Sequence, residues 1–480
     1  MAHTIGRYGP RWSWLGKLAC AASKPFVRAF AAYHHFFPGA SLQAQTLGRQ
    51  LRRKLRRGET VYVAGLGVGG HNTGAALIAV SPRGITLLGN HEEERYSAIK
   101  HCADFPQHAL AVLKEQLARL HLRPRDIHAL VASWNYVDSV AQGVAAVMEE
   151  LPQSVTLLRP EANPPLNGTH FLQGMTCAAR LAQTLGLEHT PPLLGLRHHD
   201  NHAYFSWAVS PFAHSREPVM VAVIDGAGDD GSISTYLVQD GRMRLLWSNQ
   251  SLYDSPGLLY GFLSSTQGGW TFNSSEGRYM GAAAWGDNNR LTNPYYRRLR
   301  QLVFFGSEGS LFLNRSWAGW HSHAHVRPYR RPLVDLLGPP IPPEKMWNPD
   351  AILNVENVEH SPITRDRVDK AAATQLLFED ILFHLIGHLI HQTRAHKLVL
   401  TGGTALNCVA NMRLLAHFDE TYYERNLEQK DTRLQLWMPP TPGDGATTRD
   451  RLDTSLPKST TNVPVAGWVA SDFGPLAPLT

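Results

Sequence analysis

The densest group of residues able to do chemistry in this chain is His198-His199-Asp200-Asn201-His202. If the segment is helical, His198 and His202 lie one turn apart on one face, with their Cβ atoms about 6 Å apart. Two neutral imidazoles at that spacing can share a transition-metal ion, and a distant carboxylate would complete a 2-His-1-carboxylate triad. The alternative is a histidine-rich helix start that Asp200 or Asn201 caps. The spacing favours the metal site.

The size and cysteine content of the chain set its class. A chain of 480 residues is too long for one core and predicts two or three domains. Its four cysteines are scattered without a CxxC pair, which argues against a disulfide framework or a thiolate zinc site and favours a reducing, cytoplasmic compartment. No stretch approaches the roughly 18 uninterrupted apolar residues of a membrane-spanning helix, so no membrane span is expected.

The net charge of +6 comes from one segment. Residues 1–58 contain 11 Lys and Arg and no Asp or Glu, whereas the rest has 35 basic and 40 acidic residues. The run from Arg52 to Arg57 could contact nucleic acid or anionic lipid. More often such a run is solvated, so we expect residues 1–59 to be a mobile basic extension unrelated to the fold and do not expect a nucleic-acid partner.

Ordered sequence is expected to begin at Val61. Apolar runs at 61–66 and 75–80 flank the glycine-rich segment 67–74, and a turn at 82–84 leads into a third run at 85–88. This pattern predicts a β-meander with a glycine-rich first hairpin. Apolar spacing then predicts a helix at 107–121, and a short apolar run predicts a strand at 127–132.

The same pattern recurs about 160 residues later. A buried strand at 219–224 ends in the glycine-rich segment 225–231, and further strands are expected at 232–238 and 242–247. A repeated module of this kind indicates an α/β fold with two similar halves, 60–215 and 216–446, that face each other across a ligand-binding cleft. An insertion is expected at 288–370, and the Ser/Thr/Pro-rich segment 447–480 predicts a disordered tail.

A third glycine turn follows the strand predicted at 397–400. It consists of Thr401-Gly402-Gly403-Thr404 and leads into a helix. Glycine pairs let backbone N–H groups approach a ligand, and a helix N-terminus favours an anion. One such turn is a weak signal, but three of them in a duplicated α/β chain are a considerably stronger one.

Two hairpins followed by a Gly-Gly turn resemble the actin, sugar-kinase and heat-shock ATPase superfamily, in which paired turns hold phosphates across a cleft. Shorter motifs resemble, in the right order over about 60–446, the nodulation and antibiotic-tailoring O-carbamoyltransferases. These motifs lie at 70–76, 92–101, 105–106, 198–203, 274–281 and 401–407.

The resemblance implies a carbamoyltransferase. Such an enzyme moves a carbamoyl group from carbamoyl phosphate, by way of a carbamoyl-adenylate made from ATP, to a hydroxyl of a sugar or natural product. It also implies Fe(II) or a similar divalent ion, with Mg²⁺ as a further candidate. By match to the family motifs, His198, His202 and Asp444 are the expected metal ligands. A homodimer is compatible with the sequence.

The remaining site residues follow from the same resemblance and from the chemistry of a mixed anhydride. A base must take the acceptor's proton, and His71 or Asp229 is the candidate, while Lys100 would place a positive charge near the carbamoyl or phosphate oxygen. Contacts to the nucleotide are expected from the three turns and from the helix at 276, with these residues: Asn72, Thr73, Gly74, Asp225, Gly226, Gly228, Glu276, Arg278, Gly402, Gly403 and Asn407.

The chain also departs from the family pattern. Arg278 stands where the family usually has lysine, and a guanidinium does not replace an ammonium in its phosphate contacts. After Asp444 the family continues into a helix and a YrdC-like domain that makes the carbamoyl-adenylate, whereas this sequence runs into Ala446-Thr447-Thr448. This ending predicts a truncated chain. It leaves open an inactive nucleotide-binding remnant, and a transferase that modifies tRNA by threonylcarbamoylation is a third interpretation.

The acceptor is not determined by the sequence. The insertion at 288–370 is rich in aromatic residues and histidine, which can stack on a sugar or simply fill a core. The residues concerned are Tyr295, Tyr296, Trp317, Trp320, His321, His323 and Trp347.

Overall fold

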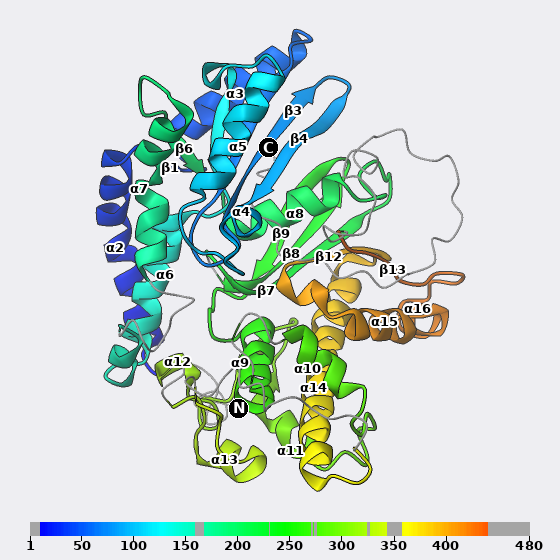
Figure 1. The fold of residues 1–480 in the computed structure, drawn as a ribbon. Coiled ribbons are helices and arrows are strands. Elements are labelled where there is room, and N and C mark those ends of the chain that lie inside the picture. The colour runs from blue at the N-terminus through cyan, green and yellow to red at the C-terminus, as the bar shows by residue number, and fades with distance from the viewer. Residues whose placement is uncertain are drawn as a thin grey trace.

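The computed structural model describes residues 10–158, 168–229, 231–269, 272, 276–323, 327–342 and 358–439. Within these ranges the chain forms two α/β lobes, each built on one mixed sheet, with a smaller helical region attached to the second (Figure 1). Asp444 and the segment 447–480 lie outside the described residues, as do Trp347 and the first two residues of the motif at 274–281.

The sheet of the first lobe contains the predicted β-meander. Strands β2 (Val61–Gly67), β3 (Gly74–Ser81) and β4 (Gly84–Glu92) are antiparallel, and β5 (Ala129–Ala132) and β6 (Leu193–Gly195) extend the sheet in parallel beyond β2. Both faces of β2 and β5 are buried, which explains their continuous apolar sequence. The helices of this lobe are α4 (Glu94–Ser97), α5 (Gln107–Arg119), α6 (Tyr136–Glu149) and α7 (Gly168–Leu185).

The second lobe repeats this topology. Antiparallel strands β7 (Val219–Gly228), β8 (Gly231–Gln239) and β9 (Arg242–Ser248) are followed, on the other side of β7, by parallel strands β12 (Lys397–Thr401) and β13 (Gln435–Trp437). The order β9-β8-β7-β12-β13 matches β4-β3-β2-β5-β6 strand for strand. The predicted duplication is therefore confirmed, because each lobe has an antiparallel meander extended by parallel strands beyond its first strand.

Helices complete the second lobe. Its main core packs α9 (Pro256–Gly268), α10 (Glu276–Ala283) and α14 (Pro362–Thr393) beneath the sheet, and α15 (Cys408–His417) and α16 (Glu420–Leu427) follow β12 (Figure 1). By length and composition α14 could cross a membrane, but 72% of its apolar window is buried inside the protein. It is therefore read as a core helix.

The segment between α10 and α14 adds small elements to this core. These are α11 (Tyr296–Leu299), β10 (Val303–Phe305), β11 (Leu311–Leu313), α12 (Trp320–His323) and α13 (Arg331–Leu337). Trp320 is only 1% exposed and stacks on Phe262, and Tyr296 donates a hydrogen bond to Asp380. These contacts favour the packing interpretation of the aromatic residues that the structure describes here.

The expectation of a mobile N-terminal extension is wrong for residues 10–58. They form α2 (Ser13–Tyr33), β1 (Phe36–Pro38) and α3 (Leu42–Arg56). Strand β1 pairs in parallel with β6 and adds a sixth strand to the first sheet, with Phe36 fully buried. Leu51 of α3 is buried against that sheet, so the basic residues of α3 occupy the opposite, solvent-facing side.

Candidate metal centre and nucleotide pocket

The histidine motif forms the start of α8 (His198–Ala208), the helix that joins the two lobes. The helix packs on β7 and β12 of the second sheet, with Ala203 in a core cluster with Val221 and Val399. Its first turn faces the end of β7, where Asp225 follows the buried apolar run that begins at Val219. The site therefore forms where a strand that ends in a carboxylate lies beneath a helix that begins with histidines.

Three potential ligand atoms meet at this point. The Nε2 atoms of His198 and His202 are 3.2 Å apart, and they lie 3.5 and 3.2 Å, respectively, from Oδ2 of Asp225. Metal–ligand bonds of about 2.1 Å place neighbouring ligand atoms roughly 3.0–3.4 Å apart, so the three atoms have the spacing of one coordination sphere. From the sequence, Asp225 was expected to contact the nucleotide, and its place beside both histidines was not predicted.

Neighbouring groups orient the two imidazoles. Nδ1 of His198 lies 3.3 Å from the carbonyl oxygen of Ser133, which favours an Nδ1–H tautomer and leaves Nε2 free to act as a ligand. The indole of Trp134 stacks on the His198 ring, with the centroids 3.8 Å apart and the planes 16° apart. Ser133 and Trp134 follow β5 of the first lobe. The first lobe therefore orients His198, a candidate metal ligand on the helix that packs on the second lobe. The sequence offered no signal for them beyond their place after a strand.

The charges at the triad favour an ionised Asp225. Burial opposes ionisation of Asp225, but the two imidazoles beside it outweigh burial and hold the pKa of Asp225 well below its usual value. Burial lowers the pKa of His198. Ligands must be deprotonated to bind a metal, and both shifts act in that direction for His198 and Asp225.

The third histidine of the motif has a structural role. His199 is fully buried, and its Nδ1 lies 2.8 Å from the hydroxyl oxygen of Ser234 on β8. Burial lowers the pKa of His199 to about 3, so the ring is neutral and packs as a core group. A Cβ on Gly228 would come within 2.5 Å of Nε2 of this ring, which explains a glycine at that position.

Asp229, a predicted base, is 1% exposed and has its carboxylate occupied by donors. It accepts hydrogen bonds from the backbone N–H of Asn135, the hydroxyl of Ser139 and the backbone N–H of His198. These donors lie at the starts of α6 and α8, where helix N-termini favour a negative charge. The contacts favour a role in joining the two lobes over a role in proton transfer.

The predicted residues of the first hairpin converge on Glu94, a carboxylate that the sequence analysis did not single out. Asn72 donates to Glu94 at 3.4 Å and its side-chain oxygen lies 2.7 Å from Nδ1 of His71. The ammonium of Lys100 pairs with Glu94 at 2.8 Å. The Lys100 pairing holds the pKa of Glu94 below its usual value although burial, the largest influence, acts to raise it. Thr73 is buried and Gly74 begins β3.

The Gly-Gly turn lies directly beside the triad. The backbone N–H of Gly403 donates to Oδ1 of Asp225 at 3.1 Å, and that of Gly226 donates to the same atom at 2.7 Å. Gly402 has φ of +89°, and a Cβ there would come within 2.6 Å of the carbonyl oxygen of Ile224. Only glycine fits at that position, and the turn thereby brings backbone N–H groups next to the candidate metal ligands.

Asn407 connects this turn to a cavity. Its side chain caps α15 by accepting from the N–H of Ala410 and exchanges hydrogen bonds with Gln375 of α14. Gln375 in turn lines a cavity of about 300 Å³ between α10, α14 and α15. The described lining residues are Met280, Ala283, Ala284, Asn288, Arg290, Gln375, Leu376, Glu379, Val409 and Arg413. Glu276 and Arg278 lie on α10 beside it, with Arg278 exposed.

Comparisons with known proteins identify the family of this chain. The family model described as carbamoyltransferase N-terminus matches residues 64–445. The uncharacterized protein sll1178 of Synechocystis is 24% identical over 74% of this chain and 52% of its own length. The nodulation protein NolNO of Sinorhizobium fredii is 26% identical over 70% of this chain and 42% of its own length. The chain therefore spans about half the length of these relatives, or less.

Solved structures similar to this chain include a ROK hexokinase from Thermus thermophilus, which is 15% identical with a TM-score of 0.33 over 79% of this chain and 92% of its own. A glucokinase from Balamuthia mandrillaris is 12% identical with a TM-score of 0.33 over 83% of this chain and 95% of its own.

The family match covers both lobes and includes the histidines of α8, Asp225 and the Gly402–Gly403 turn. The chain belongs to the carbamoyltransferase family, in which it corresponds to the N-terminal region.

Proposed function

We propose that this protein transfers a carbamoyl group from a carbamoyl-adenylate, derived from carbamoyl phosphate and ATP, to a hydroxyl group of a sugar or another natural product. The observation that carries the proposal is the triad of His198, His202 and Asp225 beside the Gly402–Gly403 turn. A metal-ligand set beside a glycine turn suits a reaction in which a phosphate leaves an acyl carbon.

The donor set fits a divalent transition metal, with Fe(II) as the expected ion. Two imidazoles and one carboxylate form a facial triad with open positions, and Asp444, outside the described residues, is the family's further expected ligand. His198, His202 and Asp225 would hold such an ion, which would supply Lewis-acid chemistry to the carbamoyl group. Mg²⁺ remains a candidate for the phosphates of ATP.

The nucleotide is proposed to lie along the turn, with its adenosine in the cavity between α10, α14 and α15. Hydrogen bonds connect the lining of the cavity with the segment beside the triad. Gln375 is hydrogen-bonded to Asn407, which caps the helix after the turn, and the N–H of Gly403 donates to Asp225. A cavity of about 300 Å³ has the size of a small ligand site. The phosphate would then lie beside the Gly402–Gly403 turn, close to Asp225 and the candidate metal ligands.

In the transfer step the acceptor oxygen forms a bond to the carbamoyl carbon, the bond from that carbon to the phosphate oxygen breaks, and AMP leaves. The acceptor's proton needs a base. Because the carboxylate of Asp229 is occupied by three donors, we assign the base to His71. Lys100 is proposed to supply positive charge to the donor, with Glu94 holding its ammonium.

The test is a single-turnover assay with synthetic carbamoyl-adenylate, Fe(II) and a panel of aminoglycoside and oligosaccharide acceptors, read by mass spectrometry. The expected product is heavier than its acceptor by about 43 Da, the mass of one carbamoyl group in place of hydrogen at the metal-assisted centre. Supplying the finished donor makes the result independent of donor synthesis.

His198→Ala should abolish the product, and the matched variant His189→Ala, at an exposed position outside the triad, should leave it unchanged. Nucleotide and metal binding without any product would contradict the proposed transfer and support a nucleotide-binding role. Absence of metal binding in the intact protein would contradict the site itself.

A further inference from the structure

The outer face of α2 is apolar and uncovered within the described part of the chain. Five large side chains on this helix are exposed, led by Tyr33 at 80% and Phe26 at 78%. The others are Trp14, Leu18 and Phe30, and exposed small residues fill the spaces between them at Ala21, Ala22, Pro25, Ala29 and Ala32. At about 100° per residue these positions form one broad face.

The opposite face of α2 holds the helix to the protein. Gly16 and Ala31 are buried, Val27 packs against the core of the first lobe, and Lys24 pairs with Asp138 of α6 at 3.1 Å. Figure 1 shows α2 at the edge of the molecule, beyond α6 and α7. A helix that is apolar on both faces exposes more apolar surface than its fold requires, and such a surface marks an interaction site.

The charges around this face indicate the kind of partner that it binds. Lys17 and Arg28 lie on nearly the same side of α2 and border the apolar face with positive charge. Helix α3 also exposes Arg49, Arg52, Arg53 and Arg56, but it packs on the opposite face of the first sheet, away from this surface. Residues 1–58 contain no Asp or Glu to offset these charges, although the rest of the chain is net acidic.

We propose that α2 docks the protein on an anionic membrane surface. The apolar residues of α2 would enter the boundary between headgroups and acyl chains, while Lys17 and Arg28 contact the lipid phosphates. Aromatic and leucine side chains beside Lys and Arg are typical of helices that lie in this boundary. The docking places the carbamoyl-transfer lobes at the membrane and does not depend on the proposed transfer chemistry.

The test is co-sedimentation of the full-length protein with vesicles of phosphatidylcholine, with or without phosphatidylserine. Binding is expected to the mixed vesicles, to fall as salt is raised, and to be weak on pure phosphatidylcholine. The double variant Leu18→Glu/Phe26→Glu should reduce binding more than about tenfold, because it places carboxylates on the inserted face. Lys17→Glu/Arg28→Glu should reduce it by a similar factor.

The matched control for the apolar face is Leu291→Glu, since Leu291 is 93% exposed in the second lobe, away from α2. Arg83→Glu, in the exposed turn before β4, is the control for charge reversal. Both should bind like the wild type, and circular dichroism should show every variant folded. Equal binding to neutral vesicles, or no binding to any vesicle, would overturn the proposal. So would a lipid-free dimer that the α2 variants abolish, because a second copy of the chain would then cover this face.

Discussion

At the scale of single residues, the site depends on Asp225. Its two carboxylate oxygens have different tasks: Oδ2 faces His198 and His202, and Oδ1 accepts from the backbone of Gly226 and Gly403. The backbone donors fix the orientation of the carboxylate, in the way that outer contacts orient metal ligands in general. The residue therefore links the metal ligands to the turn that we propose for the phosphate.

We predict that Asp225→Asn weakens binding of Fe(II) or Co(II) by at least about tenfold, because it removes the charged ligand of the triad. Anaerobic titration followed by absorption or calorimetry measures this. The control is Asp240→Asn, at a turn position with φ of +51° that asparagine tolerates well. Unchanged metal affinity in Asp225→Asn would exclude this carboxylate as a ligand.

Two glycines beside the triad give a second residue-scale prediction. A Cβ on Gly228 would meet the ring of His199 at 2.5 Å, whereas a Cβ on Gly226 would have no atom within 4 Å. Gly228→Ala should therefore displace α8 and lower the free energy of unfolding by about 1–3 kcal/mol. Gly226→Ala should leave it nearly unchanged. Urea denaturation of the two variants checks the contrast, and equal stabilities would show that His199 moves freely.

At the scale of elements, the starts of two helices share one carboxylate. Asp229 at the β7–β8 hairpin receives donors from the starts of α6 and α8, which belong to different lobes. The hairpin that the sequence predicted as a phosphate turn is thus also the contact that aligns the histidine helix.

Asp229→Asn should lower the free energy of unfolding by about 2–4 kcal/mol, because the amide keeps one acceptor oxygen and turns an NH₂ group toward buried donors. Thermal and urea unfolding measure the loss. A base with no structural role would behave differently: its variant would keep full stability and lose only the pH dependence of transfer. That result would assign the role of general base to Asp229.

The cavity formed by α10, α14 and α15 gives a prediction about the nucleotide. Ala284 lines the cavity but is itself exposed, so Ala284→Trp should fill the space without disturbing the core. We expect it to weaken ATP binding more than about tenfold in calorimetry, since most of a bound nucleotide's surface would lose its site. Ala118→Trp, an exposed position on α5, is the matched control. Wild-type affinity in Ala284→Trp would place the nucleotide elsewhere.

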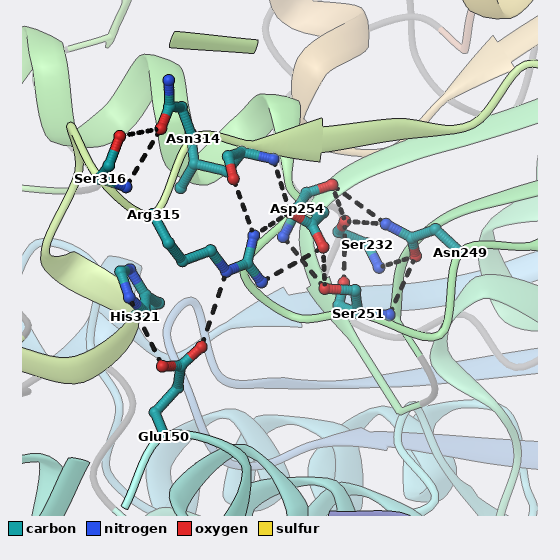
Figure 2. Close-up of polar contacts among 10 residues, drawn as sticks. Glu150, Ser232, Asn249, Ser251, Asp254, Asn314, Arg315, Ser316 and His321 are labelled. Atoms are coloured by element: carbon teal, nitrogen blue, oxygen red, sulfur yellow. Dashed lines mark hydrogen bonds and ion pairs between the residues drawn. The ribbon is translucent and has the colours of Figure 1, made fainter. Parts of the chain in front are cut away.

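At the scale of the whole molecule, a buried charge cluster joins the lobes away from the triad. Figure 2 shows Arg315, which follows β11, between Asp254 of the second lobe and Glu150 at the end of α6. His321 lies 3.8 Å from the other oxygen of Glu150. Arg315 and Glu150 are both largely buried, so removal of Arg315 would leave Asp254 and Glu150 without this buried positive charge.

Glu149 beside this cluster makes stability depend on pH. Burial raises the pKa of Glu149 from 4.5 to about 7; Arg315 opposes the rise, and Glu150 and Asp254 add to it. The unfolded chain loses this proton near the ordinary carboxyl pKa and the folded chain only near pH 7. Stability from this group is therefore present at low pH and declines between about pH 4.5 and 7.

Glu149→Gln should consequently gain stability relative to the wild type on going from pH 5 to pH 7.5, by on the order of 1–2 kcal/mol. Urea denaturation of both proteins at the two pH values measures the difference. Glu115→Gln, on the exposed face of α5, should show no such change. A constant difference between wild type and Glu149→Gln across this range would contradict the raised pKa.

The sequence by itself determined the repeated modules and the pair of histidines. Alternating apolar runs and glycine turns are local properties, and they predicted the two antiparallel meanders and the i, i+4 spacing of His198 and His202. The basic composition of residues 1–58 was also evident from the sequence, but the helices and the strand that this segment forms were not predicted. Phe36 is buried by the pairing of β1 with β6, more than a hundred residues away in the sequence. Leu51 is buried against strands of the first sheet.

Only the tertiary structure decided which carboxylate completes the triad. Asp225 and Asp229 occupy the same short motif, and pattern alone could not assign one to metal ligands and the other to helix starts. The pairing of β7 and β8, with its shifted register between Ile224 and Gly228, determines where each carboxylate lies relative to α8. Such positions depend on contacts between distant segments, because the chemistry of a carboxylate is the same wherever the chain places it.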